Sequence, residues 1–206
     1  MTELSLPAIP PRHVPRLTPG QWGLIAFLFS EIAFFGTLIV AYMAFFGRDH
    51  QPGGLGGPTP LGVLSLSLVI VTTLCLLSSS VTVHLADRAI RRNARGAFNL
   101  FWAATIVLGI AFLAGTAYEW FELITRHKLT ISRNLFGSSF YTLVGFHAFH
   151  VTVGVIVMTL ILSLSLAGLM TEKTHGSIAL VSWYWHFVDV VWIVVFSVVY
   201  LLPRLQ

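Results

Sequence analysis

The run from Ser182 to Tyr200 constrains this 206-residue chain more than any other part of its sequence. The run is almost wholly apolar or aromatic, yet it contains an ionisable pair, His186 and Asp189. A helix of about 20 residues spans the roughly 30 Å hydrocarbon core of a bilayer, so the run is long enough to cross a membrane. His186 and Asp189 lie three residues apart and share one face of such a helix. Because an aspartate within a membrane is costly unless it faces a partner, the pattern predicts a membrane helix whose polar face packs against protein.

The composition of the whole chain indicates the same class of protein. Hydrophobic residues make up 56% of the sequence and charged residues only 10%, whereas a soluble domain carries about 25% charged residues. The chain is therefore predicted to be an integral membrane protein. Its single cysteine, Cys75, excludes an internal disulfide and a Cys-rich metal site. The formal net charge of +4 comes from predicted loops and indicates anionic lipid headgroups as partners, with no nucleic acid.

We predict an all-α fold, a bundle of five transmembrane helices with no second domain. A polar N-terminal tail, 1–19, precedes the membrane domain, 20–206. Lysine and arginine are somewhat more numerous in the tail and in the loops expected on its side of the membrane, so the positive-inside rule favours a cytoplasmic N-terminus. The five helices are expected at about 21–46, 61–85, 97–123, 137–169 and 178–202.

Glu31 is the single charged residue of the first predicted helix. At 1.5 Å per residue it lies near the middle of the bilayer, where a carboxyl group is either neutral or paired. Two interpretations remain open. Glu31 is a carboxylate linked to proton movement, or it is a protonated side chain that hydrogen-bonds a neighbouring helix.

The histidines allow a metal site or a set of buried hydrogen bonds. His147 and His150 share a helix face, and further histidines lie on two other predicted helices, so imidazoles could converge on haem or a metal ion. Acidic residues on the third and fifth helices can balance the same histidines without a metal, and we favour this second interpretation. We therefore predict no catalytic residue and no metal ligand in this chain. The expected buried, interhelical polar residues are His84, Glu119, Glu122, His147, His150, His186 and Asp189.

Aromatic and basic residues near the helix ends are predicted to contact lipid or a neighbouring protein. Tryptophan is enriched at both membrane–water interfaces, and arginines next to a membrane helix attract anionic headgroups. The residues assigned to this interface are Trp22, Arg88, Arg91, Arg92, Trp183, Trp185 and Trp192.

Four motifs, in order along the chain, resemble subunit III of the haem–copper respiratory oxidases. The ten residues from Trp183 to Trp192 are similar to the signature of its last helix. Residues 30–35 resemble the segment that carries the family's carbodiimide-reactive glutamate, and Glu31 occupies that position. Residues 117–122 resemble a paired-acid segment, and 137–151 resemble a motif that ends in two histidines. The chain starts at the third helix of the seven-helix form, and it is similar to the five-helix bacterial form.

The resemblance implies a non-catalytic accessory subunit of a proton-translocating terminal oxidase in a bacterial plasma (inner) membrane. Such a subunit packs against catalytic subunit I, supports proton uptake and protects subunit I from inactivation during aerobic electron transport. It has no cofactor of its own, since haem and copper belong to partner subunits, but it has room for bound phospholipid.

The electron donor stays open at this point. A glutamate at position 31, where we expect aspartate more often in the quinol branch, favours a cytochrome c oxidase. The alternatives are subunit III of a quinol oxidase and an accessory subunit of nitric oxide reductase. Two more distant alternatives are a free-standing membrane haem protein and a proton-coupled transporter that uses Glu31 and Asp189.

Overall fold

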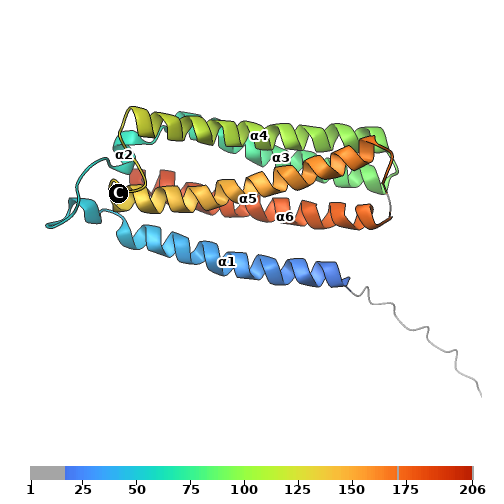
Figure 1. Cartoon of the computed structure of the whole chain (residues 1–206), viewed down its shortest axis with the longest axis horizontal. Helices are drawn as coiled ribbons and strands as arrows, with labels where there is room; N and C mark the ends of the chain where they lie inside the picture. The colour runs from blue at the N-terminus through green and yellow to red at the C-terminus, as the bar shows by residue number, and fades with distance from the viewer. Residues whose placement is uncertain (1–16, 171, 206) are drawn as a thin grey trace, which may run out of the picture.

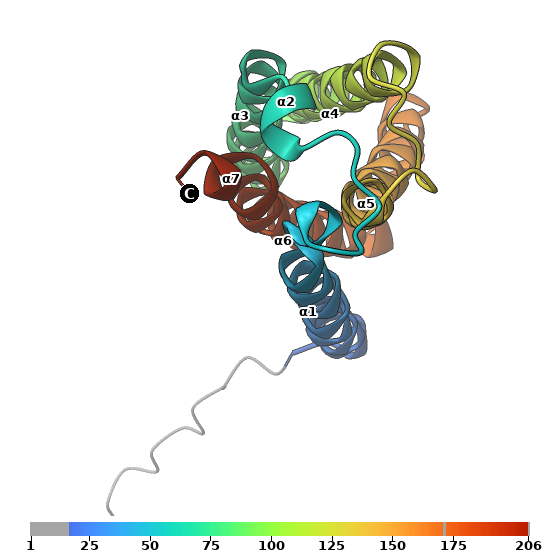
Figure 2. The same cartoon turned by 90° about the vertical axis from the view of Figure 1, so that its left-hand side faces the viewer.

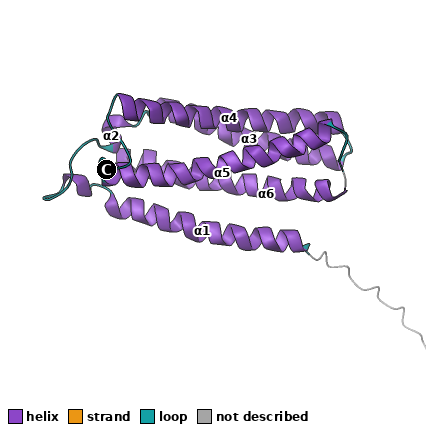
Figure 3. Ribbon diagram, in the orientation of Figure 1, coloured by secondary structure: helices purple, strands orange, loops and turns teal. Residues whose placement is uncertain are grey.

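Five long helices make up most of the chain in the computed structural model, which describes residues 17–170 and 172–205 (Figure 1). All five are long and apolar enough to cross a membrane, so the predicted all-α membrane bundle is confirmed. No strand occurs in these described ranges (Figure 3). The long helices are α1 (Pro19–Phe45), α3 (Leu66–Arg91), α4 (Arg95–Thr125), α5 (Leu135–Leu166) and α6 (Glu172–Phe196). The short elements are η1 (Arg48–His50), α2 (Pro60–Val63), the π-helical turn η2 (Ser197–Leu201) and α7 (Leu202–Leu205).

Four of the long helices form a closed ring, and the fifth lies outside it. Viewed from one end of the bundle, α3, α4, α5 and α6 form the four sides of the ring, and α1 packs against α5 and α6 (Figure 2). The beginning of α1 lies at the same end as the α3–α4 and α5–α6 connections, and the C-terminus lies at the opposite end (Figure 1). We call these the N-terminal and C-terminal ends of the bundle. The start of α1 and the C-terminus lie at opposite ends because the number of membrane-spanning helices between them is odd.

Local sequence signals set the helix ends. Thr18 and Gln21 exchange hydrogen bonds as a capping box, and Pro19 occupies the first helical position of α1. The second membrane helix was expected at 61–85, but α3 runs from Leu66 to Arg91. Its start differs because Thr59 and Pro60 begin a separate short helix, α2. Its end differs because Asp87 and Arg91 pair across one turn, and the chain leaves the helix only where Asn93 adopts a φ of 57°. Residues 1–16 of the predicted tail lie outside the described part of the chain.

Two tryptophans of the last motif fill the centre of the ring. Trp185 is 0% exposed, and its Nε1 donates to Ser79 Oγ at 2.8 Å. Trp192 is 1% exposed, and its Nε1 donates to Thr73 Oγ1 at 3.0 Å. The prediction that these two residues contact lipid or a neighbouring protein was therefore wrong. They lie seven residues, or nearly two turns, apart and so share the inner face of α6, whereas Trp183 lies on another face.

The remaining predicted anchors lie on the surface. Trp183 is 40% exposed and Trp22 is 61% exposed. Arg88, Arg91 and Arg92 are exposed at the N-terminal end of the bundle. The aromatic and basic surface at this end therefore has the composition that suits a membrane interface.

Asp49 connects the loop after α1 to the start of α5. Its carboxylate is 5% exposed and accepts from the backbone N–H groups of Leu135 and Phe136 at 3.0 and 2.9 Å. These two N–H groups belong to the first turn of α5 and have no partner within the helix.

Replacing Asp49 with alanine is expected to lower the free energy of unfolding by about 1–2 kcal/mol, because both N–H groups lose a charged acceptor. Unfolding in mixed micelles, followed by circular dichroism, measures this loss. Glu122→Ala is the control: Glu122 pairs with Arg126 on the surface of α4, and its loss should cost about 0.5 kcal/mol or less. Equal losses for the two variants would contradict the capping role.

Candidate functional site

A groove between α1, α5 and α6 contains the glutamate that the sequence singled out. The groove has a volume of about 520 Å³, and its lining is mostly apolar. In its lining Glu31 Oε2 lies 3.0 Å from Nε2 of His150, and the side chains of Glu31 and His150 are 15% and 10% exposed. Sequence reasoning allowed a neutral or a paired carboxyl in this helix. The structure shows a partner, and it comes from α5.

A hydrogen bond of His150 fixes which of its ring nitrogens faces the carboxyl group. Nδ1 of His150 lies 2.7 Å from the backbone carbonyl oxygen of Phe146. A carbonyl oxygen only accepts, so Nδ1 carries a hydrogen and Nε2 faces the carboxyl group. The 3.0 Å separation places an ionisable carboxyl group beside an ionisable imidazole, so each is the electrostatic partner that a polar group within the membrane requires.

Aromatic side chains surround this pair. The ring of Phe35 lies edge-on to the imidazole of His150, with 5.1 Å between centroids. Tyr184 of α6 donates from its hydroxyl to the backbone carbonyl of His150 at 2.9 Å. Phe34 packs against Phe146 across the groove, with 4.9 Å between centroids. The pair therefore lies in an apolar groove where polar interactions are stronger than in water.

A second polar group lies between α3 and α6. Ser80 Oγ is 3.0 Å from Nδ1 of His186 and also hydrogen-bonds Oδ2 of Asp189. Asp189 is 3% exposed, and His186 is half-buried between the two helices. The polar face that the sequence predicted for α6 thus packs against α3. Sequence reasoning did not identify Ser80, because it follows two other serines and only its orientation on the helix distinguishes it from them.

A third buried acid lies near the C-terminal end of the ring. Tyr200 donates from its hydroxyl to Glu119 Oε2 at 2.8 Å, and both side chains are buried.

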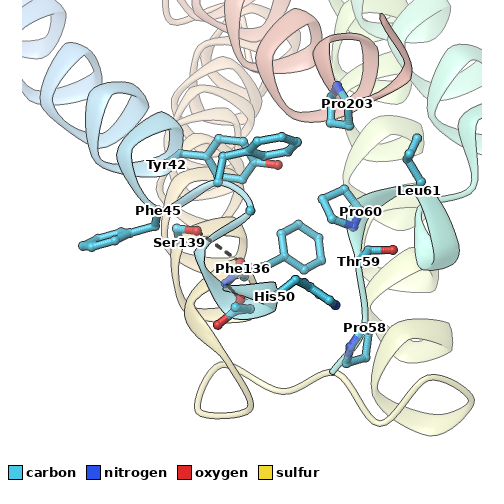
Figure 4. Close-up of a pocket in the computed structure, with 13 residues that line it drawn as sticks. Tyr42, Phe45, His50, Pro58, Thr59, Pro60, Leu61, Phe136, Ser139 and Pro203 are labelled. Carbon is cyan, nitrogen blue, oxygen red and sulfur yellow. Dashed lines mark hydrogen bonds between the residues drawn. The ribbon is translucent and has the colours of Figure 1, made fainter. Parts of the chain in front are cut away.

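A small cavity of about 190 Å³ lies at the same end, between the end of α1, α2, the start of α5 and α7 (Figure 4). Tyr42, Phe136 and Pro203 line it, and Ser139 beside them donates to the Phe136 carbonyl at 3.2 Å. Its lining is mainly apolar.

Two residues expected to be buried between helices are not buried. His84 is exposed, although it lies one turn from Ser80 on α3. Glu122 is only half-buried and pairs at 2.7 Å with Arg126, which is four residues away in the same helix. Both predictions were wrong because each residue lies within the last two turns of its helix, where a polar side chain can reach water or lipid headgroups.

The four membrane histidines do not converge on one point. His147 is 0% exposed and stacks on Trp192 with 4.7 Å between ring centroids, and neither of its nitrogens has a hydrogen-bond partner within the described residues. His150 faces Glu31, His186 faces Ser80, and His84 is exposed. Within ranges 17–170 and 172–205 no group of three His, Cys, Asp or Glu side chains is placed to hold a metal ion. The convergence that a shared metal site requires is thus not found in this part of the chain.

Comparison with known proteins identifies the family. The family model described as Cytochrome c oxidase subunit III matches residues 9–203. Cytochrome c oxidase subunit 3 of Synechocystis sp. is 39% identical over 183 residues, which cover 88% of this chain and 75% of the relative. The protein of the same name from Alkalihalophilus pseudofirmus is 34% identical over 196 residues and 93% of both chains. That of Pan troglodytes is 34% identical over 191 residues, covering 91% of this chain and 72% of the relative. The chain therefore belongs to the cytochrome c oxidase subunit III family.

Proposed function

We propose that this chain is an accessory subunit of a proton-translocating terminal oxidase of the cytochrome c oxidase type. In this role it supports proton uptake by catalytic subunit I and protects that subunit during aerobic electron transport. The observation that carries the proposal is the Glu31–His150 pair, because Glu31 lies in the segment that resembles the one with the family's carbodiimide-reactive glutamate. The pair lies in a groove whose lining is mostly apolar.

The position of α1 supports a role at a contact between subunits. This helix lies outside the ring and uses only one side to contact α5 and α6. Its remaining sides expose large apolar residues, among them Phe29, Ile32 and Val40. A change in the protonation or hydrogen bonding of Glu31 therefore acts on the helix that has the most surface free for a partner. Subunit I is the partner we propose, with haem and copper held by the catalytic subunits.

The surroundings proposed for this subunit follow from its surface. The exposed arginines at the N-terminal end favour placing that end, with the N-terminus, on the cytoplasmic side of a bacterial plasma membrane. The groove beside Glu31 has an apolar lining that suits the acyl chain of a phospholipid. The three relatives named above are cytochrome c oxidase subunits, which favours cytochrome c over a quinol as the donor.

A hydrophobic carbodiimide tests the chemistry of Glu31 directly. We expect the reagent to modify Glu31 in preference to Asp87 and Glu122, because it partitions into the groove and reacts with a protonated carboxyl group. Peptide mass spectrometry of the labelled oxidase measures the distribution. The same test on His150→Leu should change the labelling of Glu31 and leave that of Glu122 unaltered. Equal labelling of the three acids in the wild-type complex would contradict this prediction.

The functional consequence is tested in the assembled oxidase. Glu31→Gln should leave the haem spectrum and subunit composition intact, but it should lower the pumping stoichiometry or the number of turnovers before inactivation. Glu122→Gln, a change of the same kind on the surface of α4, should leave all of these at the wild-type level. If Glu31→Gln leaves pumping, turnover lifetime and subunit association unchanged, Glu31 is a structural residue and the proposed role is wrong.

A further inference from the structure

A file of polar side chains runs between α3 and α6, apart from the Glu31–His150 groove. It contains His186, Ser80 and Asp189 in that order, with Ser80 Oγ in hydrogen-bonding contact with the side chains on both sides. Asp189 lies at the inner end of the file. Its Oδ1 is buried and has no hydrogen-bond partner in the described part of the chain.

The outer end of the file opens into a small polar cavity. This cavity has a volume of about 170 Å³, and its lining is mostly polar. The polar lining residues are His84, Asp87, Arg91, Ser182 and His186, and the others are Ala179 and Trp183. It lies at the N-terminal end of the bundle, where α3 ends at Arg91. A water molecule needs roughly 10–15 Å³ and two to four polar partners, so the cavity can hold several. His186 is therefore both a wall of the cavity and a neighbour of Ser80.

Ser80 can pass a proton in either direction. A hydroxyl group donates one hydrogen and accepts others. In one arrangement the protonated Asp189 donates from Oδ2 to Ser80, and Ser80 donates to Nδ1 of His186. In the other, Nδ1 of His186 donates to Ser80, and Ser80 donates to the carboxylate of Asp189. The two arrangements have the same heavy-atom contacts and differ only in where the protons are.

Other ionisable groups lie on the cavity side of the file or are already engaged. His84, Asp87 and Arg91 of α3 face the cavity, and Asp87 is paired with Arg91 at 2.9 Å. On α5, His147 stacks on Trp192, one turn beyond Asp189.

The remaining acids in the membrane have partners elsewhere. Glu119 of α4 is bonded to Tyr200, and Glu31 of α1 faces His150. Within the described part of the chain, Ser80 is therefore the hydrogen-bond partner of the Asp189 side chain. A carboxylate with a single neutral partner is costly in a membrane, which favours the protonated acid as the resting form.

We propose that His186, Ser80 and Asp189 form a proton relay that connects the polar cavity with a buried, reversibly protonated acid, Asp189. On release, the proton on Oδ2 of Asp189 passes to Ser80 Oγ as the hydroxyl proton of Ser80 passes to Nδ1 of His186. His186 then gives its Nε2 proton to a water or a side chain of the cavity, and uptake runs through the same steps in reverse. The relay is a property of this chain alone, and it does not depend on the function proposed for Glu31.

Infrared spectroscopy of the full-length chain in lipid nanodiscs tests the relay. With the aspartate carboxyl groups labelled with carbon-13, the acid band of Asp189 is identified by its loss in Asp189→Asn. After transfer to D₂O, this band should shift much faster than the amide bands of the helical core. Ser80→Ala should slow the shift by about 100-fold, the usual contribution of a positioned proton-transfer group. Ser80→Thr, which retains a hydroxyl, should restore fast exchange.

Ser79→Ala is the matched control. Ser79 precedes Ser80 on α3, but its hydroxyl is bonded to Trp185, so this variant should exchange at the wild-type rate. Equal rates for Ser80→Ala and Ser79→Ala would overturn the relay, and so would the absence of an Asp189 acid band at every accessible pH. Should Ser80→Ala not fold, the wild-type chain decides: exchange at Asp189 much faster than in the core amides supports the relay, and exchange as slow as theirs overturns it.

Discussion

Replacing Trp185 with alanine is expected to lower the free energy of unfolding by about 3–5 kcal/mol, the cost of removing a large side chain from a packed core. Trp185 touches every other helix of the ring. Its indole nitrogen is bonded to Ser79 of α3, and its ring fits against Gly109 of α4 and Gly154 of α5. A Cβ atom at either glycine would come within 2.9 or 2.7 Å of the ring, so the two helices approach this tryptophan as closely as the backbone allows. Alanine would leave a cavity at the centre of the ring, because the four helices cannot all move inward to fill it.

Trp183→Ala is the matched control for this prediction. It removes the same side chain two residues away on α6, at a position that is 40% exposed and outside the ring. Its effect on the free energy of unfolding should be well below that of Trp185→Ala when both are unfolded in mixed micelles. Gly154→Ala should also destabilise the bundle, by about 1–3 kcal/mol, because the added methyl group overpacks the ring of Trp185. Similar losses for the two tryptophan variants would show that the centre of the ring is not packed as described.

Removing His150 alone is expected to destabilise the protein more than removing His150 and Glu31 together. His150→Leu leaves the carboxyl group of Glu31 buried without its partner, which costs about 1–3 kcal/mol. In Glu31→Leu/His150→Leu both groups are apolar and the groove is uniformly hydrophobic. This double variant should therefore be within about 1 kcal/mol of the wild type. With Glu31→Leu as the second single variant of the cycle, the coupling free energy between the two residues should be about 1–3 kcal/mol, as found for residues in direct contact.

The surface pair on α4 gives the comparison for this cycle. Glu122 and Arg126 lie 2.7 Å apart, but Arg126 is 71% exposed, so their coupling should be about 0.5 kcal/mol or less and should fall with added salt. The coupling between Glu31 and His150 should change little with salt because both side chains are nearly buried. Coupling of the two pairs that is equal in size and in salt dependence would contradict the assignment of Glu31–His150 as a buried pair.

The number and kind of the long helices could be predicted from the sequence because hydropathy is a local property. Each crossing needs only about 20 consecutive apolar residues, and the residues within a run determine whether it can lie in a bilayer. The spacing of His186 and Asp189 likewise placed both on one face of α6 without reference to other helices. The family could be recognised for a related reason, since its motifs are short contiguous stretches such as Trp183–Trp192.

The partner of each polar side chain was decided only by the tertiary structure. The membrane helices here are apolar on most sides, so their sequences give little information on which side faces protein and which faces lipid. The rotation of α6 within the ring placed Trp185 inside and Trp183 outside. The packing of α1 beside α5 brought Glu31 to His150, and that of α3 beside α6 brought Ser80 to Asp189. These pairings join residues that are about 110–120 positions apart, and their geometry depends on how rigid helices pack rather than on any local preference of the chain.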